Sequence, residues 1–418
     1  MGNIRKLKSE EEFASFVDIV VNAYPGTSEP TASSKEQLVQ AFLKKQEEDS
    51  AVDFVGLFRN GTLIGGMRLH TYEMNLYSKW VKVGGVGLVA VDLLHKKEKA
   101  AKEMIEYFIQ ENLKQGICFT ALYPFNPGFY HKMGYGYGPK MVQYTIEPGS
   151  FPKSPEKGTL VFLKEEDKDR LNECYERVAV NTHGMFKKTA GELSALFKQP
   201  HLRIVGIEEN GVIRGYSVFS FRKDPNGNFL LNDLVIRELV YETPEVLKKL
   251  CNFIHSQADQ VNRVEWNTQD DSLHFLLHDS RNGTNRLIPS VYHADALTGV
   301  GLMYRISNVK QFISTLQHRN FNGKTITFKL HIEDSFVPSN NQEMVIDCKN
   351  GQIVAKNDGS YEVEMRIDIA HFSSLFMGVI PFSQLYKFGL VKLSNPTYAG
   401  ELDRFFYTPD KPICTTAF

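Results

Sequence analysis

The sequence lacks the features by which several classes of protein are recognised. Its five cysteines include no CxxC pair and are odd in number, which fits free thiols better than disulfides or a zinc site. The formal net charge is −1, so no overall field attracts nucleic acid or an anionic membrane. No stretch approaches about 18 uncharged apolar residues, and the N-terminus has no apolar signal segment. We therefore expect a cytoplasmic protein with no metal and no nucleic-acid or membrane partner.

The length of the chain indicates two or three domains. It has 418 residues, of which 42% are hydrophobic and 23% charged, an ordinary globular composition. Residues 147–158, "EPGSFPKSPEKG", hold three prolines and two glycines and are interpreted as a linker. A softer break falls at 288–301. The expected domains are 1–147, 158–295 and 300–418.

An internal echo supports the first boundary. "FVGLFRNGTLIGGMRL" from Phe54 and "IVGIEENGVIRGYSVF" from Ile204 share one Asn and three Gly positions in a single register. Each copy is typical of two strands joined by an Asn-Gly type I′ turn. The echo favours duplicated domains. The last segment, from about residue 301, has a helical stretch, strand-like stretches and two more helical stretches, which is an α+β pattern.

A basic turn follows a buried strand in the first copy. "VKVGGVGLVAVDLL" (81–94) is apolar on both faces, with Gly84 and Gly85 expected to mark a bulge. "HKKEKAAKEMIEYFIQENLKQG" then gives a helix that ends at Gly116. The free N–H groups at such a helix start bind phosphates, and Lys96 and Lys97 add charge. From the residues alone, a solvated, charged helix entry is favoured over a phosphate site.

A second apolar strand, "CFTALYP", runs into "FYHKMGYGYG" (129–138). A short helix over Phe129 to Met133 and a glycine-rich returning strand are expected. Tyr130 is either a functional phenol or a buried aromatic. Cys118 lies inside the apolar strand and is interpreted as a core residue, not a nucleophile. The end of the chain, "TPDKPICTTAF", contains two prolines, so it either frays or lies extended in a groove.

"FYHKMGYG", with the strand, basic turn and helix upstream, resembles the acetyl-coenzyme A site of GNAT acetyltransferases. The whole chain resembles an Eis-type (enhanced intracellular survival) N-acetyltransferase; the stretches that carry this include "VAVDLLHKKEKAAKEM", "FYHKMGYG", "CYERVA", "LHFLLHDSR", "SLFMG" and "ELDRFF". The resemblance implies tandem GNAT domains, the second degenerate, followed by a sterol-carrier-protein-like α+β domain. It also implies a homo-oligomer.

The resemblance implies a set of site residues. Tyr130 would be the general acid that protonates the leaving thiolate, and the terminal carboxylate of Phe418 would take the proton of the acceptor amine. The motif glycines would let the strand bend away beside the cofactor. Acetyl-CoA would be held by the following residues: Val89, Ala90, Val91, Lys96, Lys97, Glu98, Lys99, Ala100, Ala101, Lys102, Phe125 and Asn126. Attack would be direct, within a ternary complex, and no metal takes part.

The chain departs from the family pattern at three places. Lys99 stands where the phosphate turn usually has glycine, and Gly26 and Ala417 stand where aminoglycoside-acetylating relatives carry acidic residues. Glu29, Glu401 and Asp403 are candidate replacements. Two functions remain open: an acetyltransferase for a small-molecule amine, either an aminoglycoside or a lysine-type amine, and a non-catalytic binding protein with an apolar-ligand site in the C-terminal domain.

Overall fold

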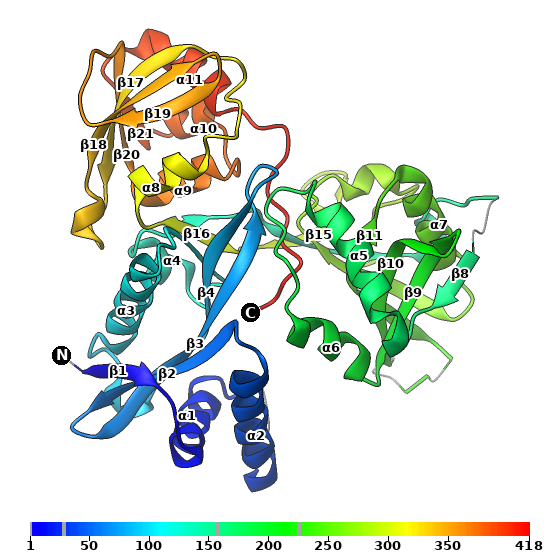
Figure 1. The fold of residues 1–418 in the computed structure, drawn as a ribbon. Helices are drawn as coiled ribbons and strands as arrows, with labels where there is room; N and C mark the ends of the chain where they lie inside the picture. The colour runs from blue at the N-terminus through cyan, green and yellow to red at the C-terminus, as the bar shows by residue number, and fades with distance from the viewer. Residues whose placement is uncertain (1, 27–30, 156–158, 224–226, 229) are drawn as a thin grey trace. The chain divides into compact units, whose positions relative to one another are not determined.

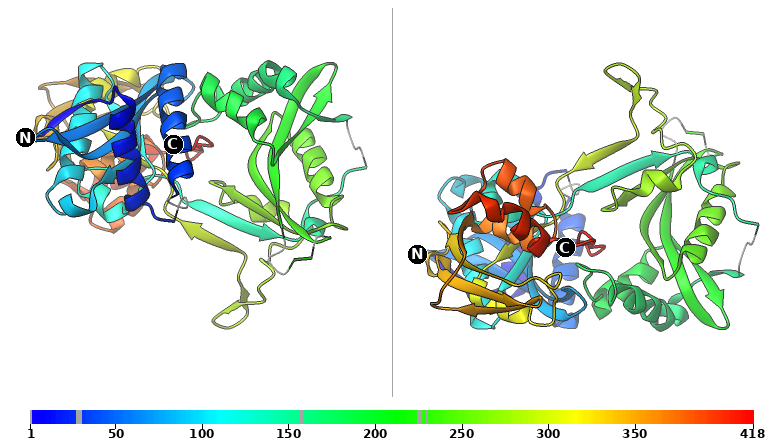
Figure 2. Two further views of the ribbon diagram at one scale, coloured as in Figure 1. Left: turned by 90° about the horizontal axis from the view of Figure 1, so that it is seen from below. Right: turned by 90° about the horizontal axis from the view of Figure 1, so that it is seen from above.

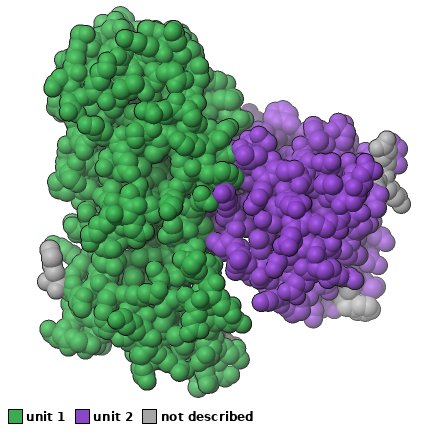
Figure 3. Space-filling model, viewed as in Figure 1, with its two compact units in different colours: residues 1–138, 302–412, 417–418 green, residues 139–301, 413–416 purple. Residues whose placement is uncertain are grey.

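The computed structural model describes residues 2–26, 31–155, 159–223, 227–228 and 230–418. The chain divides into two compact units (Figure 3). Unit 1 comprises Met1–Gly138, Leu302–Pro412 and Ala417–Phe418. Unit 2 comprises Pro139–Gly301 and Ile413–Thr416. Both units mix helices and sheets, as expected.

Unit 1 contains a sheet of seven strands in the order β1-β2-β3-β4-β5-β16-β6 (Figure 1). The strands are β1 (Asn3–Lys6), β2 (Val52–Arg59), β3 (Thr62–Asn75), β4 (Trp80–Val91), β5 (Phe119–Leu122), β6 (Gly136–Tyr137) and β16 (Met303–Ile306). Asn60 and Gly61 join β2 to β3 with φ of 50° and 80°, which confirms the expected turn.

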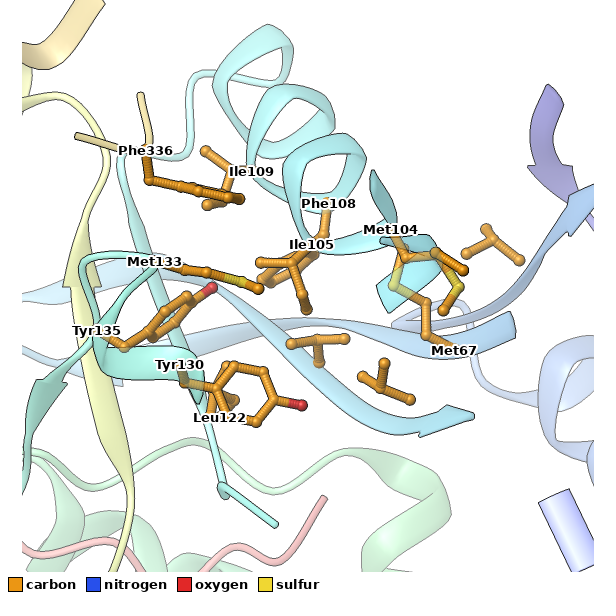
Figure 4. Close-up of a cluster of buried hydrophobic side chains, with 14 of the residues drawn as sticks. Met67, Met104, Ile105, Phe108, Ile109, Leu122, Tyr130, Met133, Tyr135 and Phe336 are labelled. Carbon is orange, nitrogen blue, oxygen red and sulfur yellow. The ribbon is translucent and has the colours of Figure 1, made fainter. Parts of the chain in front are cut away.

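Four helices accompany this sheet: α1 (Glu10–Ala23), α2 (Ala32–Glu48), α3 (Ala100–Lys114) and α4 (Pro127–His131). The side chains of Ser9 and Thr31 cap α1 and α2 by accepting backbone N–H groups. Helix α3 buries Met104, Ile105 and Phe108 against the sheet, as its periodicity predicts (Figure 4). This packing holds the start of α3 at the end of β4.

The C-terminal part of unit 1 is a second sheet in the order β19-β18-β17-β20-β21. Its elements are α8 (Val309–Thr315), β17 (Ile326–Glu333), β18 (Glu343–Lys349), β19 (Gln352–Lys356), β20 (Val363–Asp368), α9 (Ile369–Phe376), α10 (Phe382–Lys387), β21 (Val391–Leu393) and α11 (Ala399–Phe406). Buried phenylalanine rings fill the space between the sheet and its helices: Phe321, Phe328, Phe372, Phe376, Phe382, Phe405 and Phe406.

Unit 2 has its own seven-stranded sheet, in the order β15-β7-β12-β11-β10-β9-β8. Its elements are β7 (Met141–Ile146), β8 (Thr159–Phe162), α5 (Lys168–Ala179), α6 (Ala190–Lys198), β9 (Leu202–Glu209), β10 (Val212–Lys223), β11 (Asn232–Tyr241), α7 (Pro244–His255), β12 (Val261–Thr268), the hairpin β13–β14 (Leu287–Ile288, Tyr292–His293) and β15 (Ala296–Gly299). Figure 2 shows the hairpin projecting from this unit in both views. The run from β8 to β12 repeats the order of β1 to β5, and Asn210 and Gly211 repeat the positive-φ turn.

The two sheets exchange their closing strands. β16, from residues after unit 2, lies between β5 and β6 and pairs antiparallel with both. β7, which follows β6 directly in the chain, pairs with β12 and β15 of unit 2. The sheet of unit 1 is therefore built from two separate stretches of sequence, whereas the strands of unit 2 all come from residues 141–299.

The structure divides the chain differently from the expected domain limits. The first division falls after Gly138, because β7 belongs to the second sheet. The prolines and glycines at 147–158 were wrongly taken to mark a linker throughout. Phe151 has no exposed surface, and its carbonyl oxygen lies 2.8 Å from Nδ1 of His255, so this part packs into unit 2. Residues 156–158 lie outside the described chain.

Among the described residues, no helix has the length and apolar character that crossing a membrane requires.

Candidate active site

Strands β4 and β5 separate at the end where β4 leads to the basic turn. Their parallel pairing covers only Gly84, Gly85 and Val86 on β4, and residues 87–91, all described, have no partner on β5. Gly84 and Gly85 pair regularly with β3, so a bulge there was wrongly predicted. The irregularity lies at Leu88 and Val89, which face the single residue Met67, because Leu88 takes a left-handed φ of 53°.

This separation leaves a backbone edge at Val89, Ala90 and Val91, where the family resemblance implies that acetyl-CoA would be held. Tyr24, the C-cap residue of α1, donates a hydrogen bond from its hydroxyl to the Val89 carbonyl oxygen at 2.7 Å. That bond fixes the bulged backbone and occupies its carbonyl. The N–H groups of the edge then remain the natural donors toward an acyl oxygen.

The basic turn leads into α3 without a side-chain cap. Lys97 and Lys99 have φ of 67° and 64°, and Lys99 occupies the N-cap position of the 15-residue helix. The first N–H groups of α3 thus keep their positive partial charge, and Lys96 is exposed beside them. Glu98 binds Arg59 at 2.7 Å and His95 at 3.2 Å. Lys102 lies 5.5 Å from the ring centre of Phe336.

Tyr130 lies in the short helix α4. The side chain of Asn126 caps the helix by accepting the Phe129 N–H at 3.1 Å, and Pro127 starts it. The Tyr130 side chain is 2% exposed and packs edge-on against Phe125 and Phe129, with ring centres 5.4 and 5.2 Å apart. Burial raises the pKa of its phenol above the ordinary value, so the hydroxyl keeps its proton.

The glycines of the motif make room for other parts of the protein. A Cβ at Gly134 would lie 1.6 Å from Nη1 of Arg305, and one at Gly136 would lie 1.9 Å from the Ala370 carbonyl oxygen. These glycines therefore admit β16 and α9, and their expected role beside the cofactor stays a prediction. Arg305 has no exposed surface, donates to the Met133 carbonyl oxygen at 2.6 Å and pairs with the buried Asp334 at 2.5 Å.

The C-terminal residue, Phe418, packs against strand β4. The ring of Phe418 contacts His70, Tyr72 and Tyr123, with ring centres 5.7, 5.2 and 5.3 Å apart. Its carboxyl carbon would be 2.8 Å from a Cβ built on Gly87. The tail is therefore ordered and ends in the same domain as Tyr130 and the 89–91 edge.

Three side chains on one face of β3 surround this residue. Arg68 donates its Nε–H to Nε2 of His70 at 2.9 Å, and Nδ1 of His70 lies 2.9 Å from Oη of Tyr72. Burial, with Arg68 nearby, lowers the pKa of His70 well below its ordinary value, so the ring is neutral. Because Nε2 accepts, Nδ1 carries the proton and donates to Tyr72. Nη2 of Arg68 is 3.5 Å from the Cβ position of Gly87, beside the terminal carboxyl group.

The sequence reasoning missed Tyr24, Arg68, His70, Tyr72 and Gly87. The alternation of Arg68, His70 and Tyr72 along a strand was a usable signal, since such residues share one face. The candidate acidic replacements do not gather here. Asp403 accepts the Ser383 N–H at 2.7 Å, and Glu401 lies on α11. Glu29 lies outside the described residues.

Comparisons with known proteins match the chain in three parts. Models described as Acetyltransferase (GNAT) domain match residues 3–138 and 184–306, and a Sterol carrier protein domain model matches residues 309–415. The chain belongs to the GNAT acetyltransferases, with two GNAT domains followed by a sterol carrier protein domain. The expected family and fold are thereby confirmed, and the chain is an N-acetyltransferase.

Solved structures share this fold over the whole chain. A GCN5-related N-acetyltransferase from Anabaena variabilis superposes with a TM-score of 0.82 at 19% identity, covering 100% of both chains. A conserved protein of Enterococcus faecalis, titled a probable N-acyltransferase, gives 0.79 at 20%, and Eis1 from Mycobacterium abscessus gives 0.77 at 19%; both cover 100% of each chain. The search of curated proteins found no match.

No group of three or more His, Cys, Asp or Glu side chains in the described part of this GNAT protein could hold a metal ion. Cys118 is buried, and burial raises the pKa of its thiol to about 12, which fits a core residue and not a nucleophile.

Proposed function

We propose that the first GNAT domain transfers an acetyl group from acetyl-CoA directly to a primary amine within a ternary complex. Acetyl-CoA supplies the thioester and binds where β4 and β5 separate. The residues there fit such a ligand: an unpaired backbone edge at 89–91 lies next to an uncapped helix start with exposed lysines. Lys96, Lys97 and the amides from Glu98 through Lys102 would hold the pyrophosphate, and Phe125 and Asn126 would line the far end.

A group of this chain can be assigned to each step of the proposed mechanism. The Phe418 carboxylate takes a proton from the acceptor amine, and the N–H groups of the 89–91 edge stabilise the charge that develops on the acyl oxygen. Tyr130 gives its proton to the leaving thiolate. Its raised pKa keeps the phenol protonated before that step. Arg68 and neutral His70 orient the terminal carboxylate.

One observation carries this proposal. The carboxyl group of Phe418 lies against Gly87, two residues before the 89–91 edge on the same strand. A chain terminus that only frays has no reason to lie at that point. The proposed proton acceptor thus lies against the same strand that carries the acyl-binding edge.

The rival function, a binding protein with an apolar ligand in the C-terminal domain, gains no support from the packing. Phe321 stacks on Phe405 with ring centres 4.8 Å apart, and Phe376 lies 4.5 Å from Phe372. These rings already fill the interior that such a ligand would occupy. The Eis-type domain arrangement does not by itself make this domain a carrier.

The acceptor is the open part of the proposal. Gly26 and Ala417 are exposed and bring no carboxylate to the site, whereas Arg68 brings a positive charge. Lysine-type amines with a single charge therefore suit the site better than polycationic aminoglycosides. We also propose a cytoplasmic homo-oligomer, which sedimentation can test.

The test combines binding with turnover. Wild-type protein should bind acetyl-CoA by calorimetry and release thiol when mixed with some member of an amine panel. Tyr130→Phe should keep the dissociation constant and lower kcat by about 10²–10⁴-fold, as expected for loss of a general acid. No acetyl-CoA binding by the wild type would refute the proposal, and an unchanged kcat in Tyr130→Phe would refute the acid role.

A further inference from the structure

The last residues of the chain are held in a second place as well. Ile413–Thr416 belong to unit 2, whereas Phe418 belongs to unit 1. The segment is irregular but alternates in burial: Cys414 and Thr416 are each 4% exposed, and Ile413 and Thr415 are more exposed. Such alternation is typical of an extended peptide with one face in a groove.

Unit 2 binds the segment mainly through its backbone. The Ile413 N–H donates to the His183 carbonyl oxygen at 2.8 Å, and the Cys414 N–H donates to Oε1 of Gln269 at 2.6 Å. Oγ1 of Thr415 lies 3.4 Å from Oη of Tyr175. His183 and Gln269 are themselves buried, so these bonds form away from water, where they discriminate most strongly.

The elements of the second GNAT domain that make these contacts correspond in order to those that form the candidate active site in the first domain. Tyr175 lies on α5 and His183 on the loop toward α6, which correspond in order to α1 and the loop toward α2. Gln269 directly follows β12, as Tyr123 directly follows β5 and contacts Phe418. The second GNAT domain thus presents the same side of its fold to the tail.

A buried ionic cluster holds in place the residues of the second GNAT domain that contact the tail. Glu238 on β11 accepts from Lys188 at 2.6 Å and from the hydroxyl of Tyr216. Nζ of Lys188 lies 4.4 Å from the ring centre of Tyr175, whose hydroxyl donates to the Phe186 carbonyl oxygen at 2.5 Å. Because both oxygens of Glu238 are engaged, the cluster positions Tyr175 and the 183–188 loop, and the carboxylate is not available as a base.

We propose that the second GNAT domain is a binding site for the chain's own C-terminal peptide, Ile413–Thr416. Its role is to fix the terminal carboxylate, a role that rests on the proposed function. Without this site, the chain beyond α11 would be a tether of about a dozen residues, and the carboxylate would have to find its place from a wide range of positions. With it, only Ala417 separates the bound peptide from Phe418, which raises the effective concentration of the carboxylate.

The test measures the rate at which an alkylating reagent modifies the thiol of Cys414 in the full chain, and mass spectrometry detects the modification. Cys414 should be protected in the wild type. Gln269→Ala removes the acceptor of the Cys414 N–H, and we expect alkylation of Cys414 to accelerate about 5–10-fold. Asn267→Ala is the matched control: it removes one side-chain hydrogen bond, at an exposed position two residues earlier, and should leave Cys414 protected.

Two internal controls separate local release from unfolding. Cys174 and Cys251 are buried in unit 2 and should stay protected in every variant. If Gln269→Ala fails to fold, Ile413→Pro removes the other donor from the tail side without touching the domain. In either variant, kcat should fall with release of the tail while the acetyl-CoA dissociation constant is unchanged.

The outcomes are distinct. Unchanged protection of Cys414 in both variants would overturn the binding site, and release of Cys414 with unaltered kcat would overturn its positioning role. A wild type that protects Cys414 yet acetylates no amine would contradict the proposed function and support the peptide site.

Discussion

Gly87→Ala tests whether the terminal carboxylate works where the structure puts it. A Cβ on residue 87 would lie 2.8 Å from the carboxyl carbon of Phe418. Ordinary contact between carbon atoms needs about 3.5 Å, so the carboxyl group must retreat by about 0.7 Å or more. Alanine is at least as compatible with a strand as glycine, so the strand itself should not be weakened.

The expected loss follows from this displacement. A shift of about 1 Å in a reacting group costs about 10²-fold in rate, so kcat should fall by about 10–100-fold. The assay is thiol release at saturating acetyl-CoA and acceptor. Calorimetry with acetyl-CoA and a thermal unfolding scan should give wild-type values.

Gly85→Ala is the matched control. A Cβ there would lie 3.1 Å from ring atoms of Phe418 and Tyr72 and 3.2 Å from the Cβ of His70, and it meets no backbone atom of the terminus among its three nearest neighbours. Those rings can give way by a few tenths of an ångström, so a much smaller loss is expected. Equal kcat in the wild type and Gly87→Ala, with the tail still bound, would refute the assignment of the base.

Three further predictions follow from the same structure. Lys99→Gly should raise the free energy of unfolding by up to about 1 kcal/mol and bind acetyl-CoA at least as tightly, because Lys99 holds a φ of 64° that favours glycine; chemical denaturation compares it with Lys99→Ala, which keeps the strain. The raised pKa of Tyr130 keeps the phenol protonated as pH rises, so kcat should not fall below about pH 10 through this group, and a loss of kcat below that pH in the wild type that is absent in Tyr130→Phe would contradict the raised pKa. Asp334→Asn should lower the free energy of unfolding by about 3–5 kcal/mol, because it leaves the fully buried Arg305 without its counter-charge; denaturation of Asp334→Asn and of the double variant with Arg305→Met measures how much the second change restores.

Local pattern predicted much of the fold. The Asn-Gly turns and the apolar face of α3 both depend on neighbours in sequence, and both are confirmed. The exchange of β7 and β16 was beyond such reasoning, because which sheet a strand joins is decided by distant partners. The same limit explains the linker error, since proline and glycine also occur in packed turns such as the one before Phe151.

The candidate site divides in the same way. Motif residues such as Tyr130 and the turn at Lys96 could be named in advance through the family resemblance. The setting of Phe418 could not, because Arg68, His70 and Gly87 meet the terminus across more than 300 residues of chain. The contacts of the motif glycines with β16 and α9 could not be predicted for the same reason, because no local pattern reveals them.

The exchanged strand also sets the order in which the protein can become whole during synthesis. When the ribosome has made the first 138 residues, β5 and β6 lack the strand that pairs with both of them, because β16 begins more than 160 positions later. Until then, the open strand edges are available to other chains. A gene fragment ending at Gly138 should therefore yield insoluble material, even though it contains Tyr130 and the whole basic turn. The catalytic half cannot be inherited or engineered as a separate module, and any recombination that separates it from the residues around Met303 leaves its sheet incomplete.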